Sequence, residues 1–89
     1  MMWTLEFSQK VHKQLRKMDP AQRTVIIKWL EKNVHGTSDP RAHGKALVGD
    51  LAGIWRYRIG HYRVLVEIQD DRLVVLALSV DHRSRVYRR

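Results

Sequence analysis

Three arginines in one short stretch are the side chains best suited to bind a charged ligand. Arg56, Arg58 and Arg63 alternate with aromatic and aliphatic residues between positions 55 and 68. Period-two alternation sends successive side chains to opposite faces of a strand, so the apolar set faces a core and the arginines share the other face. Like charges that face each other destabilise a sheet by up to about 1 kcal/mol. We therefore predict that this cluster binds an anionic ligand.

The register of this predicted hairpin follows from its turn. Gly60-His61 is a two-residue connection of the Gly-X kind, which suits a type II′ turn. Each residue before such a turn faces the residue equally far beyond it. The predicted pairs are Ile59 with Tyr62, Arg58 with Arg63, Tyr57 with Val64, and Trp55 with Val66. The three aromatic side chains of these pairs are predicted to pack in the core.

A second basic cluster closes the sequence, directly after an apolar run at 73–80. Beyond residue 46, Lys is absent and every guanidinium or ammonium group belongs to Arg. The planar fork of Arg matches phosphate oxygens and stacks on bases, so we expect the phosphate-binding surface in the C-terminal half, with Lys45 beside it. The residues of the closing cluster are His82, Arg83, Arg85, Tyr87, Arg88 and Arg89.

The composition indicates one small basic domain, residues 1–89. Lys and Arg number 17 against 9 Asp and Glu, and the pI near 10.5 is typical of a protein that binds nucleic acid or an acidic partner. The absence of cysteine excludes disulfides and zinc–thiolate sites. The aspartates, Asp81 among them, are predicted at turn and cap positions, without metal-ligand spacing. No metal and no cofactor is predicted.

A cytoplasmic location is expected from two features of the sequence. Its start has no basic segment followed by an apolar run, as an export signal would. No stretch of 18 consecutive apolar residues is present, so no membrane segment is predicted.

The elements that must position these residues belong to an α+β fold. Ser8 and Asp19-Pro20 are helix-start signals, and the run at 73–80 is apolar on both faces, which is typical of a central strand. The predicted elements are a strand at 3–7, a helix at 9–17, a helix from 20 to near the glycine at 36, a loop at 37–53, the hairpin, and a strand at 73–80.

This β-α-α-β-β-β order, together with four short motifs, resembles the RelE/ParE superfamily of bacterial toxins over essentially the whole chain. The motifs are Lys45-Ala46-Leu47, Gly53-Ile54-Trp55-Arg56-Tyr57-Arg58-Ile59, Tyr62-Arg63-Val64, and His82-Arg83 through Val86-Tyr87-Arg88. The resemblance implies two N-terminal helices packed on one face of a mostly antiparallel four-stranded sheet. It is stronger to the RelE branch than to the ParE branch.

Resemblance to the RelE branch implies that the protein is a ribosome-dependent endoribonuclease. Such toxins cut mRNA in the ribosomal A site and are neutralised by a co-expressed antitoxin. ParE-like relatives share the fold but inhibit DNA gyrase and lack the complete set of matching residues. A non-enzymatic RNA or DNA binder is the third possibility. By position, the resemblance implies catalytic roles for Arg56, Arg58, Arg63, Arg83 and Tyr87, and we expect RNA contacts from Lys45, His61, His82, Arg85 and Arg88.

Cleavage of RNA by its own 2′-hydroxyl needs a base, an acid and cations around the transition-state charge, and arginines supply the cations without a metal. Members of the family often have Lys at the positions of Arg56 and Arg58, where a Lys can act as the base. A guanidinium cannot be deprotonated in a protein, so the proton transfer must come from another group. Tyr87 is the first candidate, and His82 or His61 is the second.

Overall fold

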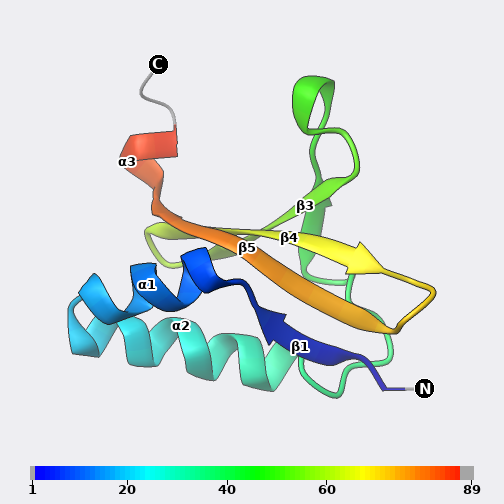
Figure 1. The fold of residues 1–89 in the computed structure, drawn as a ribbon, viewed down its shortest axis with the longest axis horizontal. Helices are drawn as coiled ribbons and strands as arrows, with labels where there is room; N and C mark the ends of the chain where they lie inside the picture. Colours follow the sequence, from blue (N-terminus) through cyan, green and yellow to red (C-terminus); the bar gives the residue numbers. More distant parts are fainter. Residues whose placement is uncertain (1, 87–89) are drawn as a thin grey trace.

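In a computed structural model that describes residues 2–86, two helices cover one face of a five-stranded sheet (Figure 1). The strand order is β1-β5-β4-β3-β2; β1 runs parallel to β5, and the other neighbours are antiparallel. The elements are β1 (Thr4–Phe7), α1 (Gln9–Lys17), α2 (Pro20–Asn33), β2 (Gly44–Ala46), the 3₁₀ helix η1 (Gly49–Leu51), β3 (Ile54–Ile59), β4 (Tyr62–Gln69), β5 (Val74–His82) and α3 (Arg83–Val86). The predicted α+β class is confirmed, with a mixed sheet.

The two N-terminal helices begin at the predicted caps. The Ser8 side chain accepts a hydrogen bond from the backbone N–H of Val11 at 3.1 Å, and the Asp19 carboxylate accepts one from that of Gln22 at 3.3 Å. Each cap satisfies a donor that the first turn of a helix leaves unpaired. The helices bury Val11, Leu15, Ile26 and Leu30 against Tyr57, Ile59, Val64 and Val80 of the sheet in one core cluster.

The hairpin has the predicted register. Ile59 pairs with Tyr62 and Arg58 pairs with Arg63 across a two-residue connection. Gly60 has φ of +58°, which only a glycine adopts without strain, as the first position of a type II′ turn requires. The strand that was expected at 73–80 is central, between β1 and β4, and it extends to His82.

The prediction of four strands was wrong because the segment at 37–53 contains a fifth. Strand β2 pairs at the sheet edge with β3, so that Gly44 faces Tyr57 and Lys45 faces Arg56. A Cβ at Gly44 would lie 3.0 Å from the Tyr57 ring, so glycine permits this close approach. Three residues without an alternating apolar pattern give no strand signal of their own, and the pairing is imposed by the neighbouring strand.

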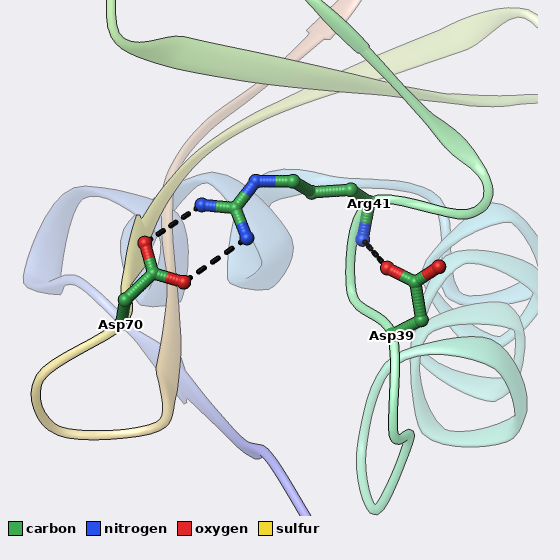
Figure 2. Close-up of polar contacts among 3 residues, drawn as sticks. All are labelled: Asp39, Arg41 and Asp70. Carbon is green, nitrogen blue, oxygen red and sulfur yellow. Dashed lines mark hydrogen bonds and ion pairs between the residues drawn. The ribbon is translucent and has the colours of Figure 1, made fainter.

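The loop before β2 is attached by Arg41 to the turn between β4 and β5 (Figure 2). Its guanidinium forms two hydrogen bonds, 2.8 and 3.0 Å long, with the Asp70 carboxylate in the β4–β5 turn. Asp39 accepts a hydrogen bond from the Arg41 backbone N–H at 3.1 Å, and the guanidinium lies 5.5 Å from the Trp55 ring centre. Arg41 in turn lowers the pKa of the Asp70 carboxyl through this bidentate contact.

A buried tyrosine holds the same loop from the core side. The Tyr57 hydroxyl donates a hydrogen bond to the buried carbonyl of Pro40, and Tyr57 itself is fully buried. Burial disfavours the charged phenolate and raises the pKa of Tyr57 to about 12. The folded chain therefore keeps this hydroxyl protonated at pH values where an unfolded tyrosine has ionised.

Replacing Tyr57 by Phe should lower the free energy of unfolding at pH 8 by about 1–3 kcal/mol, because the Pro40 carbonyl loses its donor. Above pH 10 the difference in free energy of unfolding between wild type and variant should narrow, because Tyr57 ionises near pH 10 in the unfolded chain but not in the folded one. This ionisation stabilises the unfolded wild type by up to about 2–3 kcal/mol at pH 12. Urea unfolding of both proteins from pH 8 to 11.5 measures this. A constant gap across that range would contradict the buried, protonated state of Tyr57.

Candidate functional site

The face of the sheet turned away from α1 and α2 carries the predicted cations. Directly opposed residues of antiparallel strands share a face, and the alternating residues Tyr57 and Val64 point into the helix-covered core. Two adjacent rows therefore lie on the open face, one of Lys45, Arg56, Leu65 and Ser79, and one of Arg58, Arg63 and Asp81. We call Lys45, Arg56, Arg58 and Arg63 the basic face.

The members of the basic face differ strongly in burial. Lys45 and Arg58 are exposed, Arg56 is half-buried, and only 3% of Arg63 is exposed. The Nε of Arg56 is a buried donor without a hydrogen-bond acceptor in residues 2–86. The predicted clustering of the three arginines on one face holds, but the structure adds that Arg63 is buried there whereas Arg58 is exposed.

Asp81 is the site residue that sequence reasoning missed. It was expected in a turn or cap, but β5 continues to His82 and places Asp81 opposite Arg63. Opposite charges at facing positions stabilise a sheet, whereas Arg58 on the other side of Arg63 has the same sign. Sequence reasoning could have found Asp81 by letting the last strand run two residues beyond its apolar segment. Asp81 would then have fallen in the row of Arg58 and Arg63.

His61, Tyr62 and His82 gather at the end of the sheet. Tyr62 pairs with both Ile59 and His82, so the row of His82 belongs to the helix side and not to the basic face. The rings of His61 and His82 stack with centres 6.1 Å apart, and Tyr62 meets His82 edge-on at 5.3 Å. The two predicted histidines thus lie together at this end of the sheet.

Helix α3 begins at this end of the sheet and is attached to it by two contacts. The backbone N–H of Arg83 donates to the His61 carbonyl at 2.7 Å, and that of Ser84 donates to His82 Nδ1 at 3.2 Å. The Ser84 hydroxyl also lies 2.8 Å from His82 Nδ1. Nδ1 therefore acts as an acceptor, and the neutral ring carries its proton on Nε2. Arg83 is exposed, next to the turn that separates Arg58 from Arg63.

The remaining predicted residues lie outside the described part of the chain. Tyr87 and Arg88 follow residue 86, and of Arg85 only the backbone, within α3, is described. Their roles stay predictions. Within residues 2–86, no group of three His, Asp or Glu side chains has an arrangement that would hold a metal ion, and no helix is long and apolar enough to cross a membrane.

Comparison with known proteins identifies the family. The family model of the ParE toxin of the type II toxin-antitoxin system parDE matches residues 5–87. The chain belongs to the RelE/ParE toxin superfamily. It is a type II toxin similar to Toxin RelG of Mycobacterium tuberculosis, with 33% identity over 89 residues and full coverage of both chains.

Solved structures of RelE toxins have the same fold. The toxin–antitoxin complex RelBE2 from Mycobacterium tuberculosis matches with a TM-score of 0.82 and 29% identity, over 94% of each chain. The isolated E. coli RelE toxin matches with a TM-score of 0.72 and 26% identity, over 96% of this toxin and 90% of that chain. The resemblance inferred from the sequence motifs is confirmed at the level of the superfamily.

The unequal burial of two facing arginines of the toxin gives a test. Arg63→Ala should lower the free energy of unfolding by about 1–3 kcal/mol, because it empties an enclosed site and leaves Asp81 without its facing cation. Arg58→Ala, at an exposed position, should stay within about 0.5 kcal/mol of the wild type. Urea unfolding at neutral pH compares the two variants. Equal stabilities would contradict the enclosure of Arg63 in the sheet.

Proposed function

We propose that this toxin is a ribosome-dependent endoribonuclease that cleaves mRNA in the ribosomal A site, inhibits translation in the cytoplasm, and is neutralised by a cognate antitoxin. The observation that supports this most strongly is the basic face, which aligns four cationic side chains on three adjacent strands. The buried Arg56 Nε, a donor with no acceptor in residues 2–86, favours an anionic ligand at this face.

The proposed reaction is a transesterification within the RNA. The 2′-oxygen attacks the neighbouring phosphorus, the bond from phosphorus to the 5′-oxygen breaks, and the products carry a 2′,3′-cyclic phosphate and a 5′-hydroxyl. A base takes the 2′ proton and an acid supplies a proton to the leaving oxygen. The phosphorane between these states has extra negative charge, which fixed cations stabilise more than they stabilise the substrate.

The arginines have separate roles in this proposal. Arg58 is exposed and binds the phosphate together with Arg83 at the start of α3. Arg63 is enclosed, so its guanidinium keeps a fixed orientation and stabilises charge without reorganising. Arg56 lies in the adjacent row beside Lys45, where both bind the flanking phosphates.

Proton transfer falls to groups other than the arginines, and Tyr87 remains the first candidate for it. His82 is the second candidate, and because its Nδ1 accepts from Ser84, any proton that it transfers moves through Nε2. Its row lies on the helix side of the sheet and not on the basic face. His61 stacks on the same ring at this end of the sheet. The metal-independent mechanism and the catalytic set of Arg56, Arg58, Arg63, Arg83 and Tyr87 are part of the proposal.

The ribosome and the antitoxin are the proposed partners. The basic face is an open sheet surface with few groups to orient an RNA chain, so positioning of the message by the ribosome supplies the missing alignment. The RelBE2 relative was solved as a toxin–antitoxin complex. A formal charge of +8 favours an acidic, partly disordered antitoxin that folds on binding.

The rival function is inhibition of DNA gyrase by protein–protein binding, which the match to the ParE family model favours. Two parallel assays separate the alternatives: primer extension on mRNA from ribosomes programmed with a defined A-site codon, and supercoiling by gyrase, each with the purified toxin. We expect A-site cuts and unimpaired supercoiling. Arrest of supercoiling without cuts would replace the nuclease with the gyrase inhibitor.

Removing an exposed guanidinium of the basic face should slow cleavage. Arg58→Ala should lower the single-turnover rate on programmed ribosomes by about 10²–10³-fold, the usual effect of deleting one fixed transition-state contact. Arg72→Ala is the matched control, because Arg72 is an arginine in the turn beyond β4, at the other end of that strand from the site, near Glu6. Similar rates for the two variants would remove Arg58 from the chemistry.

Tyr87→Phe separates binding from proton transfer. If the Tyr87 hydroxyl moves a proton in the reaction, this variant should lose cleavage while keeping its affinity for programmed ribosomes, because only the hydroxyl is removed. Cosedimentation with ribosomes measures the affinity and primer extension measures the cuts. Cleavage at the wild-type rate would transfer the role to another group, with His82 tested next by substitution with Gln.

A further inference from the structure

A groove with a volume of about 600 Å³ opens at the end of the sheet where His82 lies, on the helix side. The C-terminal part of α1, the start of β4 and the end of β5 form its walls, and the acidic residues Asp19 and Asp81 also line it. This volume lies within the range of sites that bind small molecules or single nucleotides. The lining residues used below are Gln14, Lys17, Tyr62, His82 and Ser84.

The groove has flat aromatic walls. Tyr62 and His82 are both half-buried and meet edge-on, with ring centres 5.3 Å apart. His61 stacks on His82 and is not among the residues that line the groove. Half-buried rings leave part of their surface open, and bases of single-stranded RNA stack on such surfaces irrespective of sequence.

Fixed polar groups lie beside these rings. The Gln14 side-chain oxygen accepts a hydrogen bond from the backbone N–H of Val80 at 2.7 Å, which orients the amide and leaves its NH₂ group as a donor. The Ser84 hydroxyl, held near His82 Nδ1, also lines the groove. A base edge that enters the groove thus meets oriented hydrogen-bonding groups.

A second hollow of about 350 Å³ continues from the groove along α1, and the two share Gln14 and Lys17. Lys10, Lys13 and Lys17 line it. Their spacing of three and four residues places them on one side of the helix, over about 10 Å of its axis. All three are exposed, α1 contains no acidic residue, and none of the three forms a salt bridge within residues 2–86.

We propose that these two hollows form one track for single-stranded RNA. A nucleotide next to the cleaved phosphate places its base against Tyr62 and His82, and the following phosphates lie along Lys17, Lys13 and Lys10. The RNA passes from the basic face around the end of the sheet at His61. This inference rests on the proposed nuclease function, because that function places the cleaved phosphate on the basic face. An acidic protein segment would use the lysines but would leave the aromatic groove without a matching group.

The test measures binding of a fluorescent 12-nucleotide RNA, made uncleavable by 2′-O-methyl groups, to the full-length toxin as a function of salt. Lys13→Gln/Lys17→Gln should weaken binding several-fold and lower the slope of log affinity against log salt by about 1.4, since each phosphate contact on a single strand contributes about 0.7. Lys28→Gln/Lys32→Gln is the control, because it removes the same charge from exposed positions of α2. It should change the affinity by less than about twofold and should leave the salt slope unchanged.

The aromatic end of the track is tested with Tyr62→Leu. This variant should bind the RNA about tenfold more weakly, the usual effect of losing one stacked base, and should bind an oligomer of abasic ribose phosphates as the wild type does. Equal losses for RNA and the abasic oligomer would show that stacking plays no part. Circular dichroism of each variant verifies that it is folded.

Two results would overturn the track. Equal weakening by the two lysine pairs would mean that only net charge attracts RNA. Unchanged RNA affinity together with weaker binding of a polyglutamate peptide by Lys13→Gln/Lys17→Gln would assign α1 to an acidic protein partner. Because the RNA is uncleavable, these results do not depend on catalysis, and a failure of the A-site cleavage assay would be recognised separately.

Discussion

The candidate site depends on a single register through three strands, in which Arg63 of β4 lies between Arg58 of β3 and Asp81 of β5. A slip of one residue would turn every side chain of a strand to the other face and would bury the arginines among the core residues. The core prevents this, because Tyr57, Val64 and Val80 form the next row and pack under α1 and α2. The apolar face therefore specifies the position of each cation on the basic face.

Contacts outside the rows maintain this register at both ends of the sheet. At one end, Arg41 connects the loop before β2 to Asp70, and so secures the edge strand that presents Lys45. At the other end, the N–H of Arg83 contacts the hairpin turn, so α3 starts beside the site (Figure 1). The cations thus come from separate elements, but these contacts hold the elements in fixed positions relative to one another. Such fixed groups suit the stabilisation of a charge that exists only in a transition state.

Most of the fold was predictable from local signals. The two-residue turn at Gly60 determines the hairpin register, and the caps at Ser8 and Asp19 determine both helix starts. Strand β2 was not predictable, because three residues with one neighbour have no pattern of their own. The facing position of Asp81 was missed for a related reason. It depends on how far β5 extends beyond its apolar run, and tertiary pairing decides that length.

In the proposed mechanism, the basic face promotes attack by the 2′-hydroxyl of a message held in the ribosomal A site. The most direct measurement uses programmed ribosomes carrying mRNA with one 2′-deoxy nucleotide at the mapped cleavage position, with an all-ribose message as the control. We expect cleavage of the ribose message, leaving a 2′,3′-cyclic phosphate, and no cleavage at the deoxy position. Cleavage of the deoxy message at the same position would contradict it, because the attacking oxygen is then absent.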